Sequence, residues 1–244
     1  LGCTAGRTTL NGEGLQHQDG HSHIIAATNP AVIAYEPTYA FEGAVLVREG
    51  LRRMLAGENV IYYLTLQNEP YVMPPKPEHI DDADVLAGGY MMQPASAVSD
   101  GLASDAPKVQ LLGSGSIMSN VLAAQKTLIE AHGIAADVWS VTSYTQWRRD
   151  ALEVEEHNRA NRLRGEDRKK SALDRGLGAT EGPIVAASDW SQQYADQVAP
   201  WLAGRLTSLG TDGFGMSDTR QALRTHFGVD TPTIVDAVLY ALGR

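Results

Sequence analysis

Long apolar runs without polar alternation constrain the fold of this chain most strongly. Residues 60–66 (Val-Ile-Tyr-Tyr-Leu-Thr-Leu) form one such run, and residues 31–35 form a shorter one. Strands that are apolar on both faces are typical of a parallel sheet covered by helices on both sides. Between the two runs, apolar residues follow Thr38 at helical spacing up to Gly57, with Thr38 as the expected helix cap. The pattern therefore predicts an α/β unit.

A second unit of this kind follows a stretch of different texture. From Pro70 to about Lys108 the sequence is rich in Pro, Gly and small polar residues, which indicates a connection between domains. Residues 109–112 and 136–141 are then expected to be strands, separated by an amphipathic helix over 117–129. This order predicts a right-handed crossover in a parallel sheet.

The remainder of the chain continues the alternation of strands and helices. Strands are expected at 183–187 and 206–209, followed by closing helices at about 218–227 and 231–242. The stretch from 148 to 175 is crowded with charge of both signs, which predicts a solvated helix with many ion pairs; a binding surface is the alternative.

Composition and charge exclude several classes of protein. The 244 residues can bury a sizeable core, and 43% hydrophobic with 20% charged residues is ordinary for a soluble globular protein. A net charge of -9 argues against a nucleic-acid partner. The single cysteine, Cys3, allows neither an intrachain disulfide nor a cysteine-based zinc site, which fits a cytoplasmic protein. No apolar run reaches the roughly 20 residues of a membrane span.

Two glycine-rich motifs fit their familiar functions poorly. Residues 113–116 (Gly-Ser-Gly-Ser) follow a strand but lack the Lys-Ser/Thr of a phosphate loop and the third glycine of a dinucleotide loop. Residues 213–217 (Gly-Phe-Gly-Met-Ser) do not spell the Gly-x-Ser-x-Gly nucleophile elbow. We therefore expect neither a nucleotide site nor a serine hydrolase.

The most conspicuous chemical groups lie in an expected loop over residues 4–29. His17, Asp19, His21 and His23 fall within seven residues of one another. Imidazole and carboxylate ligands suit zinc or iron, although the spacing is not that of a helical pair of ligands. From the residue types alone, a metal site, a catalytic or ligand-facing loop and a polar loop that caps backbone groups all stay open.

The segment from Thr8 to His23 (TTLNGEGLQHQDGHSH) closely resembles a segment of the homodimeric pyruvate dehydrogenases of bacteria. The stretch from Arg148 to Gly178 departs from the family's pattern. Further blocks follow in the family's order and approximate spacing: Tyr35-Glu36-Pro37, Asn68-Glu69-Pro70-Tyr71, residues 111–116, Trp139-Ser140-Val141-Thr142-Ser143, Ser188-Asp189-Trp190, residues 209–215 and Ser217-Asp218-Thr219-Arg220.

This resemblance implies a domain organisation. Such enzymes resemble transketolases in having three α/β domains. Residues 1–90 would then be the end of a thiamine-diphosphate-binding-fold (pyrimidine) domain and residues 91–107 a linker. Residues 108–244 would form a transketolase C-terminal-like domain with a mostly parallel sheet. Because the chain opens at Leu1 directly into motif-rich sequence, we expect it to be the C-terminal part of a longer protein.

The resemblance also implies an activity for the intact enzyme. It would decarboxylate pyruvate oxidatively with thiamine diphosphate and Mg²⁺, and transfer the acetyl group to the lipoyl group of a dihydrolipoyl acetyltransferase, as a cytoplasmic homodimer. The family's diphosphate motif, Gly-Asp-Gly followed by paired asparagines, is absent, and residues 211–213 (Thr-Asp-Gly) only approximate it. The ligands of the diphosphate and of the metal are therefore expected outside this chain.

The residue carried over from the family is His17, which matches a histidine that faces the active centre. We expect His17 to be catalytic and to contact the cofactor, with His21 as a second catalytic candidate and Asp19 as a second cofactor contact. A group that exchanges protons near neutral pH suits this chemistry. The chain alone is expected to be inactive. The alternatives are a non-catalytic binding or structural module and one subunit of a heteromeric thiamine enzyme.

Overall fold

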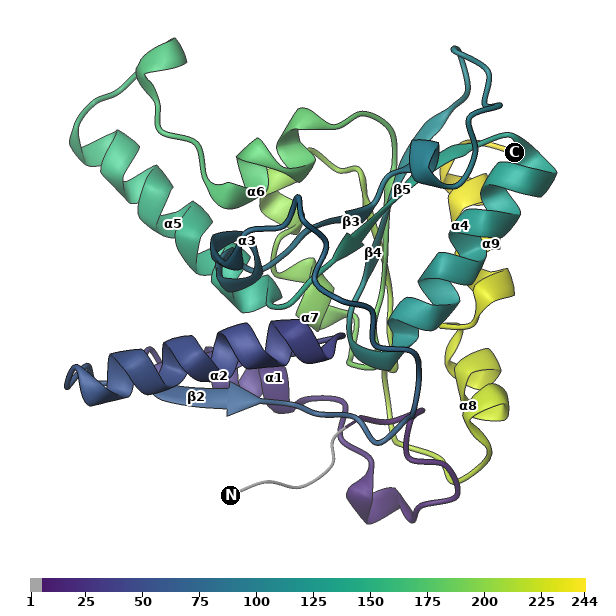
Figure 1. The fold of residues 1–244 in the computed structure, drawn as a ribbon, viewed down its shortest axis with the longest axis horizontal. Coiled ribbons are helices and arrows are strands. Elements are labelled where there is room, and N and C mark those ends of the chain that lie inside the picture. Colours follow the sequence, from purple (N-terminus) through teal and green to yellow (C-terminus); the bar gives the residue numbers. More distant parts are fainter. Residues whose placement is uncertain (1–5) are drawn as a thin grey trace.

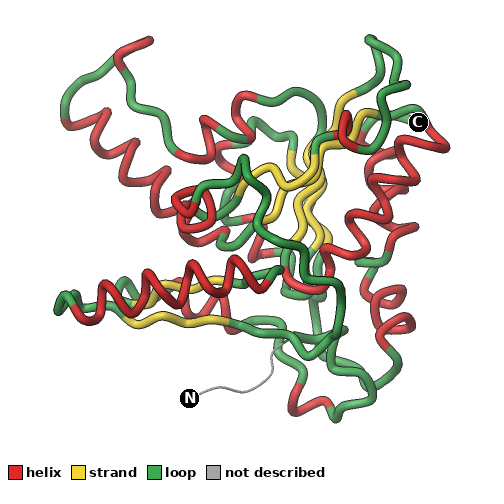
Figure 2. Tube along the Cα trace, in the orientation of Figure 1, coloured by secondary structure: helices red, strands yellow, loops and turns green. Residues whose placement is uncertain are grey.

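A computed structural model describes residues 6–244 as two α/β units, each built on its own sheet (Figures 1 and 2). Residues 1–5, and with them Cys3, lie outside the described residues. The smaller sheet pairs β1 (Val32–Tyr35) with β2 (Ile61–Leu64) in parallel, with Val32 opposite Ile61. Both apolar runs are therefore strands, as their sequence predicts.

The larger sheet has the strand order β3-β5-β4-β6-β7. Neighbouring strands run parallel except at the edge, where β3 is antiparallel to β5. The strands are β3 (Tyr90–Gln93), β4 (Lys108–Gly113), β5 (Ala135–Ser140), β6 (Ile184–Ala187) and β7 (Leu206–Leu209). The helices are α1 (Ser22–Ala27), α2 (Ala40–Leu55), α3 (Asp82–Ala87), α4 (Met118–His132), α5 (Tyr144–Ala160), α6 (Ala172–Arg175), α7 (Gln193–Asp196), α8 (Arg220–Phe227) and α9 (Thr231–Ala241).

Helices cover both faces of the larger sheet (Figure 1). On one face α4 and α9 pack against Val109, Leu111 and Val138. On the other face α5, α6 and α7 pack against Leu112 and Ile184. Because both faces are buried, the strands need no polar alternation, which is the physical basis of the predicted parallel sheet.

Helix α2 connects the smaller unit to the larger sheet through one buried carboxylate. The backbone N–H groups of Thr38 and Tyr39 donate to Glu42 Oε2 at 2.5 and 2.9 Å. The hydroxyls of Tyr90 and Ser140 donate to Glu42 Oε1, both at 2.6 Å. Thr38 was the expected cap, but the helix begins after Tyr39, and Glu42 satisfies the free backbone donors.

The stretch expected to be only a connection between domains contains regular structure. Helix α3 and strand β3 lie within it, and β3 joins the larger sheet. Gly88 and Gly89 resemble a flexible linker in the sequence, but in the structure they form a left-handed turn and a close packing contact. Gly88 ends α3 at φ +119°, and a Cβ on Gly89 would lie 2.5 Å from Trp147 Cζ2. The domain boundaries at 90 and 108 stay a prediction.

The charged stretch from 148 to 175 is only partly helical. Helix α5 ends at Ala160, and the chain after it projects away from the sheet before it returns through α6 (Figure 1). Among the described residues, no ion pair involves any side chain of this stretch. The prediction of a helix with many ion pairs is therefore wrong.

The expected loop over residues 4–29 also contains a helix. The short helix α1 begins directly after His21 and includes His23, the last member of the cluster. Within residues 6–244, no helix is long and apolar enough to cross a membrane.

Candidate functional site

His17 lies in a single 3₁₀ turn, Leu15–His17, and its side chain is exposed to solvent. The turn closes through a hydrogen bond from the backbone N–H of His17 to the carbonyl of Gly14, at 3.0 Å. Leu15, with 57% of its surface exposed, lies in the same turn. The imidazole is thus available to a bound molecule. Its position depends on the loop that carries it.

A buried carboxylate fixes the start of this loop. Asp189 follows β6 and is fully buried. Its Oδ2 accepts from the backbone N–H of Arg7 at 2.6 Å and from the Thr9 hydroxyl at 3.1 Å. Its Oδ1 accepts from the backbone N–H and the hydroxyl of Thr8, at 2.9 and 2.5 Å. Charge-assisted bonds of this kind are about twice as strong as neutral ones.

The Arg7 side chain fixes the segment that follows β7. Its Nη1 donates to the carbonyl of Thr211 and, at 2.7 Å, to the carbonyl of Gly213. The guanidinium also lies 5.7 Å from the ring centre of Phe227. Burial lowers the pKa of Arg7, and the nearby Asp189 carboxylate opposes that shift. Arg7 is therefore a buried structural residue that joins the start of the His17 loop to the segment after β7.

Gln18, directly after His17, holds the loop to the turn that precedes α8. The backbone N–H of Met216 donates to Gln18 Oε1 at 2.7 Å, and Gln18 Nε2 donates to the carbonyl of Met216. A side chain at Gly215 would collide with Gln18, because its Cβ would lie 2.5 Å from Oε1. Phe214 in this turn is 94% exposed. The turn with His17 is thus anchored on both sides and bordered by exposed apolar side chains.

The side chains of Asp19 and His21 have different surroundings. Asp19 Oδ1 accepts from the backbone N–H groups of His21 and Ser22, at 2.9 and 3.0 Å, and so starts α1. His21 is exposed. In the described part of the chain, no hydrogen bond or ion pair joins the side chains of His17, Asp19 and His21. Nor does any group of three or more His, Cys, Asp or Glu residues there have the arrangement of a metal site.

His23 differs from the other histidines because it is completely buried. Its Nε2 lies 2.8 Å from the Thr65 hydroxyl. The rings of Trp190 and Tyr194 each lie 4.6 Å from the imidazole, centre to centre. Burial lowers the pKa of His23 to about 3. His23 is therefore a neutral core residue on the buried side of α1, whereas His21, directly before this helix, is exposed.

Glu36 is a buried acidic group that the sequence analysis did not single out. It follows β1 directly, and Gln67 Nε2 donates to its Oε1 at 3.1 Å. Gln67 Oε1 in turn accepts from the backbone N–H of Ser116 at 2.5 Å. Burial raises the pKa of Glu36 to about 8, and the Ser114 hydroxyl and the Trp190 N–H partly offset this rise. Its position at the carboxyl end of a parallel strand was the signal available in the sequence.

The turn at residues 113–116 is occupied by protein groups. A Cβ on Gly115 would lie 2.5 Å from both Glu36 Oε1 and Gln67 Oε1. The Ser116 N–H that a phosphate would need is already bonded to Gln67. Gly115 therefore serves close packing between the two units, whereas Gly113 packs against Met118 and Val121 of α4.

An ion pair completes the contact between the two units. Arg224 in α8 pairs with Glu69, and its Nη1 donates to Glu69 Oε1 at 3.2 Å. The same guanidinium donates to the hydroxyls of Ser116 and Thr8, at 3.2 and 3.4 Å. One side chain thus joins the His17 loop, the segment after β2 and the turn after β4.

Five of the groups at this junction lie at or beyond the carboxyl ends of parallel strands. Glu36 follows β1, Ser114 follows β4 and Asp189 follows β6, while Gln67 lies beyond β2 and Thr211 beyond β7. The carboxyl ends of parallel strands are the usual place for ligand sites in open α/β sheets. The sequence blocks that carry the family resemblance are far apart along the chain, and the structure brings residues from each of them to this junction.

This arrangement defines a transketolase-type α/β protein, in which two α/β units meet at the carboxyl ends of their parallel strands. A solved transketolase from Pichia stipitis has the same fold, with a TM-score of 0.66 at 17% identity, and the match covers 99% of this chain and 29% of that one. The chain belongs to the family of transketolase-like C-terminal domains, because the model "Transketolase-like TK C-terminal domain" matches residues 88–230.

The sequence relatives give the first part of the chain a family as well. The model "Pyruvate dehydrogenase E1 component middle domain" matches residues 1–74. The "Pyruvate dehydrogenase E1 component" of Mycobacterium tuberculosis is 46% identical over 99% of this chain, and that of Escherichia coli K12 is 43% identical over 100%. The chain spans about a quarter of the length of each of these two relatives. The resemblance to bacterial pyruvate dehydrogenases is thus confirmed, as is the transketolase-like α/β fold.

Proposed function

We propose that this chain is the C-terminal part of a pyruvate dehydrogenase E1 component and contributes His17 to its active centre. The complete enzyme would be a cytoplasmic homodimer that decarboxylates pyruvate and acetylates the lipoyl group of a dihydrolipoyl acetyltransferase. The observation that carries the proposal is the contrast around His17. Its imidazole is exposed, while the loop on both sides is fastened by Asp189 and Gln18.

The described residues suit the reacting end of thiamine diphosphate better than its diphosphate end. Thiamine diphosphate with Mg²⁺ would supply the carbanion chemistry. No acidic or histidine cluster in residues 6–244 suits the metal, so its ligands and those of the diphosphate would come from the rest of the enzyme. His17 would hold or donate a proton where negative charge develops on the substrate, and His21 is the second candidate for this role. Asp19 already binds backbone N–H groups, which favours a positioning role in the loop.

Replacing His17 by alanine in the complete enzyme should lower kcat/KM for lipoyl acetylation by about 10²–10⁴-fold, because a positioned proton donor contributes this much. The melting temperature should stay unchanged, since the imidazole is exposed. The matched control is Gln16→Ala, in the same turn and equally exposed, which should keep its activity. Normal lipoyl acetylation by the His17→Ala enzyme would remove the catalytic assignment.

The division of the cofactor site can be tested with the 244-residue chain itself. Titration calorimetry of thiamine diphosphate with MgCl₂ into the chain should show no binding, because the groups for the diphosphate and the metal are expected elsewhere. The complete enzyme is the positive control. Saturable heat from the chain alone would mean that it builds a whole cofactor site, and would contradict the proposed division.

A further inference from the structure

A closed loop at the end of α5 concentrates positive charge on a protein that is otherwise acidic. We name residues 159–170 the basic loop. It carries six basic and two acidic side chains, whereas the whole chain has a net charge of -9. All six basic side chains are exposed. They are Arg159, Arg162, Arg164, Arg168, Lys169 and Lys170.

The basic loop has a defined conformation. Arg162 adopts a left-handed φ of 54°, and the backbone N–H of Leu163 donates to the carbonyl of Asn158 at 2.9 Å, which ends α5 in a Schellman-type turn. The Asn158 side chain, only 4% exposed, then binds the far end of the loop. Its Nδ2 donates to the carbonyl of Lys169 and its Oδ1 accepts the Lys169 N–H, both at 2.9 Å. A loop closed in this way presents its charges with little loss of entropy on binding.

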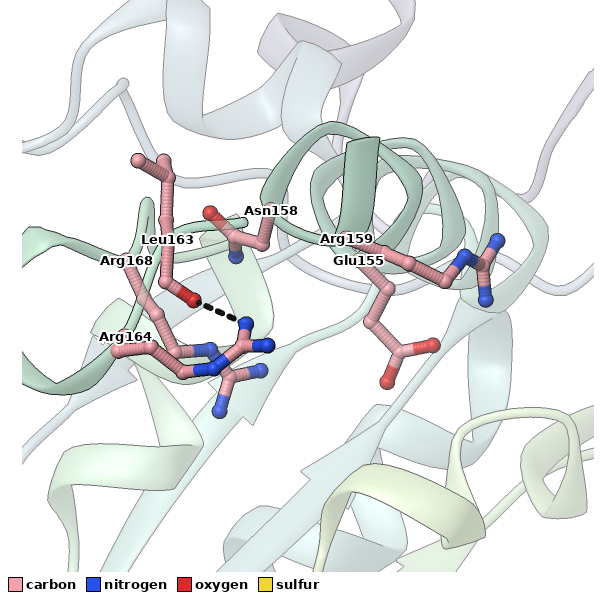
Figure 3. A pocket seen from close by; sticks show the side chains of 6 residues that line it. All are labelled: Glu155, Asn158, Arg159, Leu163, Arg164 and Arg168. Atoms are coloured by element: carbon pink, nitrogen blue, oxygen red, sulfur yellow. Dashed lines mark hydrogen bonds between the residues drawn. The ribbon is translucent and has the colours of Figure 1, made fainter. Parts of the chain in front are cut away.

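The charges of the basic loop are not neutralised within the described part of the protein, where none of the six forms an ion pair. Arg164 and Arg168 both line a hollow of about 330 Å³ (Figure 3). Arg164 Nη1 donates only to the carbonyl of Leu163, at 3.0 Å. Glu155, the one acid at this hollow, already accepts from Trp201 Nε1 at 2.8 Å.

A second hollow of about 310 Å³ extends the same surface. It shares Arg168 with the first and is lined by Lys169 and Lys170 together with the acids Glu166 and Asp174. Guanidinium groups bind carboxylates through two parallel hydrogen bonds. Basic side chains outnumber acidic ones at both hollows, three to one at the first and three to two at the second, so both favour carboxylate side chains and the first does so more strongly.

We propose that the basic loop is a docking surface for a carboxylate-rich segment of a partner protein. The extent of the positive charge favours a short acidic segment over a nucleic acid or an anionic membrane. Acidic residues lie at the tip of the loop, at Glu166 and Asp167, and on the adjacent helix, at Glu153 and Glu156. A long array of phosphates would extend beyond the basic loop onto Glu153 and Glu156 and be repelled, whereas a short segment would contact the basic loop alone.

Fluorescence anisotropy on the full chain tests this docking surface. A labelled peptide of Asp and Glu residues should bind saturably, and its affinity should fall as salt rises. A matched Asn and Gln peptide should not bind. Neutralising two charges with Arg164→Gln/Arg168→Gln should weaken binding of the acidic peptide at least about tenfold. The control, Lys108→Gln/Lys126→Gln, removes two exposed charges elsewhere and should bind as the original chain does.

A second variant separates the shape of the loop from its charge. Asn158→Ala keeps all six basic residues but releases the far end of the loop, so it should also weaken peptide binding. The proposal is overturned if the neutral peptide binds equally well, or if the arginine variant binds like its control. It is also overturned if duplex DNA or phosphatidylserine vesicles bind through Arg164 and Arg168 more tightly than the acidic peptide.

Discussion

Replacing Asp189 by asparagine should release the loop that carries His17. An amide has one oxygen, so the backbone N–H of either Arg7 or Thr8 must face an NH₂ group, and the charge assistance is lost. We expect the free energy of unfolding to fall by about 3 kcal/mol. For a domain of this size that loss corresponds to a melting temperature lower by roughly 6–12 °C, measurable by calorimetry.

In the complete enzyme, the same change should lower activity although Asp189 does not contact the substrate, because the loop with His17 is no longer held in place. The control is Asp212→Asn, which removes one exposed carboxylate from the same region. Among the described residues, the Asp212 side chain accepts one weak hydrogen bond, from the backbone N–H of Gln192 at 3.4 Å. A melting temperature for Asp189→Asn equal to that of Asp212→Asn would show that the buried carboxylate does not hold the loop.

The stability of the chain should fall as the pH rises from about 6.5 to 8, and Glu36 is the main reason. Burial raises the pKa of its carboxyl to about 8 in the folded protein, from an ordinary value of 4.5. Between these two values the folded state keeps a proton that the unfolded state has lost. Its contribution to stability is therefore complete below pH 4.5 and is lost as the pH rises, by about 1.4 kcal/mol per pH unit.

His23 gives the opposite dependence. Burial lowers its pKa to about 3, from 6.5. As the pH falls below 6.5 the unfolded state takes up a proton that the folded state refuses, so stability is lost on the acidic side. Between pH 4.5 and 6.5 the two effects cancel. Above pH 6.5 His23 no longer opposes Glu36, and the contribution of Glu36 to the free energy of unfolding should drop by about 2 kcal/mol up to pH 8.

Glu36→Gln should remove this alkaline loss, because the amide keeps the size of the side chain and can still accept from Gln67. Urea unfolding at pH 6.5 and pH 8 measures the difference. Glu181→Gln, which changes a carboxylate that is 75% exposed, is the control and should leave the pH profile as it is. If the profiles of the original chain and Glu36→Gln run parallel, Glu36 is not protonated in the folded state.

The amino-acid sequence determined the local elements of this protein. Apolar runs without alternation identified β1 and β2 as strands of a parallel sheet, although Ile61 of β2 is 57% exposed. The motif around His17 also identified the family without any structure. That His17 and His21 are catalytic, and that Asp19 contacts a cofactor, stays a prediction. Both histidines are exposed, as a contact with substrate requires.

Only the tertiary structure decided which distant groups support His17. Asp189 binds Arg7 across 182 residues, and Arg224 binds Glu69 across 155. The periodicity of the sequence does not predict such partners, because they meet only where the fold brings the carboxyl ends of the strands of both sheets together. The same holds for Gly88 and Gly89, which resemble a linker in the sequence but pack against Trp147. Local patterns predict local burial, whereas the partner of a buried polar group is known only after the chain has folded around it.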